Sequence, residues 1–314
     1  MRWLKKEAGS TDVILGRTMA PYLLNSVNVD IVVEQPRAAF DLAWLFPKIT
    51  FDQFMTERDW MVPRFFDPDD RKVLLSIHTY VLRTKHRTIL FDTCCGNHKD
   101  RGGVYPFHMV DTPYLENLAA LGCRPEDVDY VMCSHLHVDH IGWNTRLQNG
   151  KWVPTFPNAK YLVSRDEAAY WEAAVRDKTE VPFGIAAYED SVAPVIAAGQ
   201  FMVVEGKDGV AALLGDEFQL YPLVGHTPGH TGLWIESGQS RALLVGDAMH
   251  SPIQILHPEW GTSGDGNPQA AERARRHIIE TCTDRDILLM TGHFPAPSVG
   301  RLVTAGGIPQ FRYA

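Results

Sequence analysis

At residues 134–140 the chain reads Ser-His-Leu-His-Val-Asp-His, which brings His135, His137, Asp139 and His140 into one short stretch. The apolar run just before it has the pattern of a β-strand, so the stretch is predicted to be a loop at a strand end. If extended geometry persists, His135 and His137 project from one face, and a bend lets Asp139 and His140 point elsewhere. This spacing is typical of a metal site and could serve two neighbouring ions.

Composition places the 314-residue chain among globular proteins, with 45% hydrophobic and 22% charged residues. A formal net charge of −8 counts against a nucleic-acid-binding surface. The basic start is not followed by an apolar stretch of signal-peptide length, and no run approaches the roughly 20 apolar residues of a membrane span. The five cysteines lack paired metal-binding spacing and are predicted to be reduced. We therefore expect a cytoplasmic protein with neither membrane nor nucleic-acid partners.

Residues 1–72 contain many large apolar side chains but no recognisable chemistry. Several prolines interrupt this segment, and the first clear strand pattern begins only at Val73. The segment is interpreted as an N-terminal extension ahead of a catalytic domain at residues 73–314. Such an extension could pack over the domain, form a pocket wall or contact a second subunit, which would make the protein a homodimer.

Polar residues also follow three later strand-like segments. The loop at residues 225–232 contains His226 and His230, and either histidine could reach a metal while the other holds the loop by hydrogen bonds. Asp247 ends an apolar strand and has two carboxylate oxygens that could bridge two cations. His293 ends another apolar strand. If these strand ends converge on residues 135–140, they complete a metal site.

Two acidic residues outside these segments are also interpreted. Asp92 lies where a predicted strand enters a tight loop, and it is either an ordinary turn residue or a hydrogen-bond support for a metal ligand. Glu167 stands three residues after Ser164, which is the spacing of a capping box that opens a helix. No chemistry is assigned to that helix. The segment 181–199 is predicted to be a loop with a short alanine-rich helix.

The order of these motifs resembles the metallo-β-lactamase superfamily, over roughly residues 73 to 300. The resemblance implies an α+β fold, a four-layer αββα sandwich with a dinuclear site at one edge of two facing sheets. Of the two loop histidines it favours His230 as the ligand and His226 as its support. The implied first metal is held by His135, His137 and His230, the second by Asp139, His140 and His293, and Asp247 bridges them.

Imidazole and carboxylate ligands without thiolates suit Zn²⁺, and Mn²⁺, Fe²⁺ or Co²⁺ are compatible with the same ligands. Two such ions lower the pKa of a bridging water towards about 7. The mechanistic hypothesis is that the bridging hydroxide attacks a carbonyl or phosphoryl centre. Asp139 would orient the hydroxide and pass its proton to the leaving group.

Within the superfamily, the chain looks closest to the branch of N-acyl-homoserine lactonases and methyl parathion hydrolase-like enzymes. Lactonases of this type have a tyrosine three residues after the bridging aspartate, where this chain has His250. That histidine is either catalytic, as a hydrogen-bond donor or proton donor, or structural. The aromatic extension, with Trp143 and Trp260, suits a small apolar or aromatic ester, lactone or organophosphate.

Two other reactions use the same fold and stay open as alternatives. One is an iron-dependent thiol or persulfide oxidoreductase, which iron content and oxygen uptake would reveal. The other is a phosphodiesterase, against which the acidic balance and the lack of a basic stripe count. A binding protein without catalysis would be expected to have lost ligands, and here every ligand position of the superfamily pattern is occupied.

Overall fold

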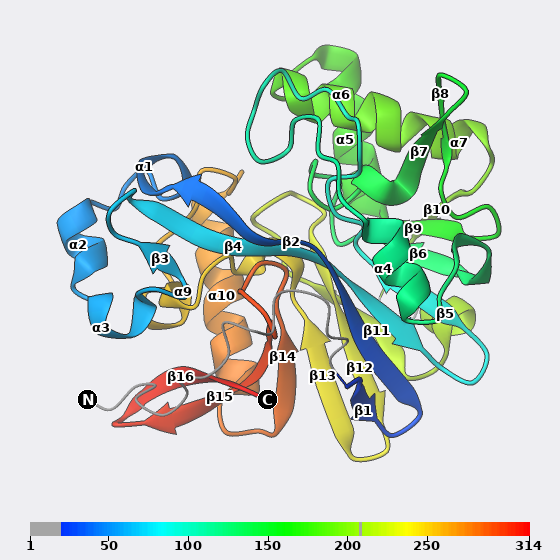
Figure 1. Ribbon diagram of the computed structural model, residues 1–314. Coiled ribbons are helices and arrows are strands. Elements are labelled where there is room, and N and C mark those ends of the chain that lie inside the picture. Colours follow the sequence, from blue (N-terminus) through cyan, green and yellow to red (C-terminus); the bar gives the residue numbers. More distant parts are fainter. Residues whose placement is uncertain (1–19, 207–208) are drawn as a thin grey trace.

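The structure is a computed structural model that describes residues 20–206 and 209–314. Two β-sheets face each other, with helices on their outer sides (Figure 1). The first sheet has the order β1-β2-β4-β5-β6-β9-β10, with β3 beside β4, and the second runs β11 to β16 in chain order. The strands of the first sheet are β1 (Tyr22–Leu24), β2 (Val27–Asp41), β3 (Phe66–Asp67), β4 (Lys72–Arg83), β5 (Thr88–Phe91), β6 (Tyr130–Met132), β9 (Lys160–Ser164) and β10 (Phe201–Val204).

The second sheet and the helices complete the architecture. The strands are β11 (Phe218–Pro222), β12 (Thr231–Ser237), β13 (Ser240–Leu244), β14 (Ile287–Met290), β15 (Val299–Ala305) and β16 (Ile308–Tyr313), and a separate hairpin pairs β7 (Thr145–Gln148) with β8 (Lys151–Pro154). The helices are α1 (Leu42–Leu45), α2 (Phe51–Met55), α3 (Arg58–Met61), α4 (Tyr114–Ala120), α5 (Arg165–Asp177), α6 (Pro182–Ser191), α7 (Ala193–Ala197), α8 (Ala211–Leu214), α9 (Ile253–Leu256) and α10 (Pro268–Cys282), with short 3₁₀ turns at Pro125–Asp127, Gly142–Asn144 and Gly246–Ala248.

Alternation along the strands explains the layers. Side chains of successive strand residues point to opposite faces, so Leu82 of β4 packs between the two sheets whereas Val81 packs towards the outer helices. Residues of α4 and α5, including Leu118 and Trp171, join the outer core of the first sheet. The apolar face of α10, including Ile278, packs on the outer side of the second sheet. The result is the expected order of helices, sheet, sheet and helices.

The described part of the N-terminal extension, residues 20–72, is built into the first sheet. Strand β2 pairs antiparallel with β4 from Asn28 opposite Arg83 to Asp41 opposite Lys72, with irregular register between Val33 and Ala38. This long pairing places β2 beside β4, and β5 lies between β4 and β6, the strand that leads into the metal-binding motif (Figure 1). The homodimer contact and the boundary at residue 72 stay predictions, and residues 1–19 lie outside the described part.

Two local expectations have different outcomes. The hydroxyl of Ser164 accepts a hydrogen bond from the backbone N–H of Glu167 at 3.3 Å, which confirms the predicted helix start at α5. The segment 181–199 is more regular than predicted, because it forms the two consecutive helices α6 and α7. Among the described residues, none of the helices has both the length and the hydropathy that crossing a membrane requires.

Candidate metal centre

The predicted ligand segments converge at one edge of the two sheets. His135, His137, Asp139 and His140 lie in the loop after β6, while the second sheet contributes a loop before β12, the turn after β13 and the loop after β14. Each loop follows or precedes a buried apolar strand, so the core positions these polar side chains. The potential ligand atoms form three overlapping groups, each within 4.8 Å: His135, His137, His226 and Asp247; Asp139, His140 and His293; Asp247, His250 and His293.

Asp247 lies between two sets of imidazoles. Its Oδ1 is 3.1 Å from Nε2 of His140 and 3.0 Å from Nε2 of His293. Its Oδ2 is 3.3 Å from Nε2 of His226 and 3.7 Å from Nε2 of His135. The two oxygens of one carboxylate thus face different groups, which is the arrangement a bridging ligand needs.

Unpartnered atoms show that these residues fit metal ions. Nε2 of His135, Nε2 of His140 and Oδ1 of Asp247 are buried and, despite the short distances, make no hydrogen bond within the described structure. Leaving a buried polar atom unsatisfied costs about 1–3 kcal/mol. Divalent cations would satisfy all three atoms, and a donor set of imidazole and carboxylate without thiolate suits zinc.

Hydrogen bonds on the outer side of the imidazoles orient four of the histidines. In each of them Nδ1 is engaged, which leaves Nε2 to face the centre, as is usual for metal-binding histidines. The outer partners are Ser134 Oγ for His135 at 2.9 Å, Asp92 Oδ2 for His140 at 2.9 Å, Asp265 Oδ1 for His226 at 3.2 Å and the carbonyl of Ser76 for His293 at 3.0 Å.

Asp92 acts as a support for the centre rather than as a simple turn residue. Its carboxylate accepts hydrogen bonds from the backbone N–H of Ser134 at 2.7 Å, from the hydroxyl of Ser134 at 2.8 Å and from Nδ1 of His140 at 2.9 Å. The same hydroxyl contacts Nδ1 of His135. One buried carboxylate therefore orients a histidine from each ligand group.

The structure corrects the choice between the two loop histidines. His230 uses both of its ring nitrogens in hydrogen bonds: Nδ1 with the carbonyl of Leu223 at 3.0 Å and Nε2 with the backbone N–H of Asp247 at 3.0 Å. No nitrogen remains to bind a metal. Nε2 of His226 instead lies 2.9 Å from Nδ1 of His137. The preference for His230 as the ligand is therefore wrong, and His230 holds the backbone of Asp247.

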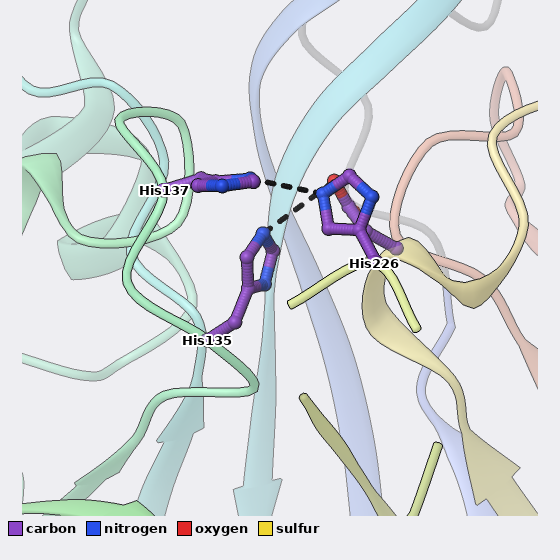
Figure 2. A group of neighbouring side chains, drawn as sticks. His135, His137 and His226 are labelled. Atoms are coloured by element: carbon purple, nitrogen blue, oxygen red, sulfur yellow. Dashed lines mark hydrogen bonds and ion pairs between the residues drawn. The ribbon is translucent and has the colours of Figure 1, made fainter. Parts of the chain in front are cut away.

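Figure 2 shows how the first ligand group is assembled. The rings of His135 and His137 reach in from the loop after β6, and the ring of His226 meets them from the opposite loop. The ring centroids of His135 and His226 are 4.9 Å apart, and those of His137 and His226 are 4.7 Å apart. Such close packing of three imidazoles is favourable only when they are neutral or share a cation.

Burial and neighbouring charges set the protonation states of the metal-free centre. Burial lowers the pKa of His135 and of His137, and adjacent imidazoles lower both pKa values further. For His140 and His293 burial acts in the same direction, but Asp247 and other carboxylates outweigh it and raise their pKa values. Metal ions would take the place of those protons, because only the neutral imidazole nitrogen binds metal.

Glu167 is a functional residue that the sequence interpretation missed. Its buried carboxylate accepts hydrogen bonds from the backbone N–H of Leu136 at 2.9 Å, from Nε1 of Trp171 at 2.9 Å and from the hydroxyl of Thr227 at 2.6 Å. It thereby joins the loop of His135 and His137 to the loop of His226. Its capping-box spacing gave no signal of this role, which depends on where α5 packs.

Glu34 of β2 supports the same loop from the N-terminal extension. It accepts hydrogen bonds from the backbone N–H groups of Cys95 at 2.9 Å and Gly96 at 3.1 Å, and from Nε1 of Trp143 at 2.7 Å. The backbone of Gly142 packs so closely on Cys95 that a Cβ would lie 1.8 Å from its carbonyl carbon. Glu34 thus connects the extension to the chain directly after the ligand residues.

His250 lies beside the metal ligands. Its Nε2 is 3.2 Å from Oδ2 of Asp247, and its ring stacks on His293 with centroids 5.2 Å apart. Nδ1 of His250 is buried and has no hydrogen-bond partner within the described residues. Burial lowers the pKa of His250, although Asp247 raises it in part. The residue is therefore placed to act on a bound substrate or to bind metal as an additional ligand.

A cavity of about 400 Å³ opens onto this centre. Its polar wall includes Asp139, His250 and the ligands described above, and its opposite wall is mostly apolar, which is typical of small-molecule sites. Neither Trp143 nor Trp260 lines this cavity. The aromatic residues that do line it are Phe40, Trp44, Phe107, Tyr170, Trp171 and Phe183.

The metallo-beta-lactamase superfamily profile matches residues 73–293, and the protein belongs to this superfamily. The N-acyl homoserine lactonase of Bacillus thuringiensis is 27% identical over 182 residues, which cover 54% of this chain and 62% of the lactonase. The chain therefore matches less than two thirds of that relative's length.

Two solved structures share the fold over nearly the whole chain. The dizinc quorum-quenching lactonase AidC, in complex with a product, has a TM-score of 0.76 and 23% identity, with coverage of 94% of this chain and 96% of AidC. The hydrolase AbOPH of the beta-lactamase superfamily has a TM-score of 0.78 and 21% identity, with coverage of 95% and 98%. The predicted superfamily fold is thus confirmed.

Proposed function

We propose that the protein is a dinuclear metal-dependent hydrolase of small, apolar or aromatic esters, lactones or organophosphates. The observation that carries this proposal is Asp247, whose two oxygens face two separate groups of histidines. The ligand sets we propose are His135, His137 and His226 for one ion and Asp139, His140 and His293 for the other, with Asp247 shared between them.

Two divalent ions, for which we propose zinc, would supply Lewis acidity and a water that is deprotonated near neutral pH. The other steps depend on side chains of the protein. Asp139 lines the cavity, and its Oδ1 and Oδ2 lie 3.7 Å and 3.6 Å from Nε2 of His140 and His293. From there its carboxylate accepts a hydrogen bond from the attacking water and passes the proton to the leaving group.

His250 has a second role in this proposal. It lines the cavity beside Asp247 and carries a ring nitrogen without a protein partner. We assign it the donation of a hydrogen bond to the oxygen that gains charge during the reaction. The apolar wall formed by Phe40, Phe107 and Phe183 holds the rest of the substrate and excludes water.

The lactonase and hydrolase relatives support this reaction class, and a substrate panel tests it. Protein reconstituted with zinc is assayed against lactones, aryl esters, phosphotriesters and thioesters, with and without a chelator, alongside metal analysis. We expect two ions per chain and hydrolysis of at least one class, with loss on chelation. Asp139→Asn is expected to keep at least one ion and lose most activity. Failure of the zinc-loaded protein to hydrolyse any class would refute the proposal.

A further inference from the structure

The cavity beside the metal centre has an unbalanced charge pattern. Within residues 20–206 and 209–314, its lining includes three carboxylates and no lysine or arginine. Two of the carboxylates, Asp139 and Asp247, belong to the proposed metal site, where cations would neutralise them. Glu180 is the third, and it belongs to none of the three groups of potential ligands.

Glu180 lies in the turn between α5 and α6, at the start of the apolar wall. Its carboxylate accepts a hydrogen bond from the hydroxyl of Tyr170, which also lines the cavity. Burial and then the neighbouring Glu180 raise the pKa of Tyr170, so the phenol stays protonated and keeps donating this bond. The next residue along the chain from Tyr170, Trp171, packs edge-on against the ring of His137 with centroids 5.9 Å apart. Glu180 is therefore held on a wall that reaches the metal ligands.

Three buried cations are each paired with a carboxylate. Asp190 binds Lys99 at 3.2 Å and Arg101 at 2.7 Å, and the side chains of both cations are fully buried. Arg275 pairs with Asp265 at 3.1 Å, also without exposure. None of these cations lines the cavity, so the part of the chain that the structure describes offers a substrate no positive side chain to offset the charge of Glu180.

We propose that Glu180 is a specificity-determining residue that selects substrates without a negative charge and promotes release of the anionic product. This inference rests on the proposed function. Hydrolysis of a carboxylic ester breaks the acyl C–O bond, adds water, and yields an alcohol, a carboxylate and a proton. The substrate is neutral, and charge appears only once the bond is cleaved. The fixed charge of Glu180 therefore disfavours the product but not the substrate.

A matched pair of esters isolates the effect of charge. In 4-nitrophenyl hexanoate the acyl chain ends in a methyl group, and in mono-4-nitrophenyl adipate it ends in a carboxylate, while the reacting ester is the same. The measured quantity is the ratio of kcat/KM for the two esters. A unit charge several ångströms from another changes such a ratio by about three- to thirtyfold, depending on the effective dielectric, and less in high salt.

The zinc-loaded protein is compared with Glu180→Gln, and with Glu172→Gln as a control that removes an exposed carboxylate from α5. We expect the unsubstituted protein to prefer the neutral ester. Glu180→Gln should reduce that preference at least threefold and should also strengthen inhibition by hexanoate at least threefold. Glu172→Gln should change neither quantity. Glu180→Ala also removes the charge, without adding an amide. The same two measurements on this variant test the proposal if Glu180→Gln does not fold.

The outcomes separate this inference from the proposed function. If the neutral ester is hydrolysed but the ratio and the hexanoate inhibition are the same in both Glu180 variants, the role of Glu180 is refuted while the reaction class stands. If the substrate panel identifies lactones or phosphotriesters instead of aryl esters, the same comparison is made with two substrates of that class. One is a neutral compound, and the other is its analogue that ends in a carboxylate. If no class is hydrolysed at all, the proposed function fails, and this inference fails with it.

Discussion

Replacing Asp92 with asparagine tests how the metal ligands are oriented. Asp92 Oδ2 accepts hydrogen bonds from the hydroxyl of Ser134 at 2.8 Å and from Nδ1 of His140 at 2.9 Å. In Asp92→Asn one of the two side-chain positions becomes an amide N–H₂ group, which donates and cannot accept. If that group replaces Oδ2, it faces two donors. His140 would then keep its proton on Nε2, the nitrogen that should bind metal.

The expected magnitude follows from these contacts. Loss of an outer hydrogen-bond partner of a metal-binding histidine typically weakens metal affinity by about 10- to 100-fold, or about 1.4–2.7 kcal/mol. Because Asp92 contacts His140 directly and His135 only through Ser134, the ion held by His140 should be weakened more. Folding should lose about 1.5–3 kcal/mol from the charged hydrogen bond.

Zinc affinity is measured by competition with a chromophoric chelator, and zinc content by elemental analysis after dialysis. Asp129→Asn provides the control, since Asp129 also accepts a backbone N–H, that of Thr88 at 2.8 Å, but contacts no metal-binding histidine. In Asp92→Asn we expect one site to bind zinc weakly and the other to bind it tightly. If each site binds zinc with the same affinity in Asp92→Asn as in the unsubstituted protein, the orientation argument is refuted.

Further predictions concern other parts of the centre. His226→Asn should lose one bound ion, whereas His230→Gln should keep both and unfold about 1–3 kcal/mol more easily, as measured by elemental analysis and urea denaturation. Glu34→Gln should weaken zinc binding severalfold in chelator competition, because an amide cannot accept three N–H donors equally well, and unaltered affinity would contradict this. Burial and then His293 lower the pKa of His78 from 6.5 to about 3, so below pH 6.5 the unfolded chain binds a proton that the folded protein does not. The free energy of unfolding of the metal-free protein should therefore fall as pH drops from about 6.5 to about 3. His78→Gln should reduce the slope of the unfolding free energy against pH by up to about 1.4 kcal/mol per pH unit, which urea denaturation across this pH range measures. Chelation should lower Tm, and added zinc should restore it, because ligands that bind only the folded state stabilise it.

Much of the centre could be predicted from the sequence. The spacing of His135, His137, Asp139 and His140 placed four ligands on one loop, because neighbours in a short loop remain neighbours in any fold. Apolar strands ending at Asp247 and at His293 indicated the other loops, since strand ends of packed sheets meet at a common edge. Those residues all lie where the structure brings ligand atoms together.

Only the tertiary structure decided between His226 and His230. Both residues lie in one loop, and local spacing says nothing about which ring nitrogens are free. His230 is occupied by the carbonyl of Leu223 and the backbone N–H of Asp247. Its exclusion from metal binding thus depends partly on Asp247, a residue that meets it only because β12 and β13 pair.

The supporting carboxylates were hidden for the same reason. Glu34 and Glu167 are distant in sequence from the motif and resemble ordinary surface or capping residues until β2 pairs with β4 and α5 packs on the first sheet. The set of candidate ligands is encoded locally by residue type and spacing. Ligand orientation depends on hydrogen bonds between segments far apart along the chain, and these exist only after the sheets and helices have packed.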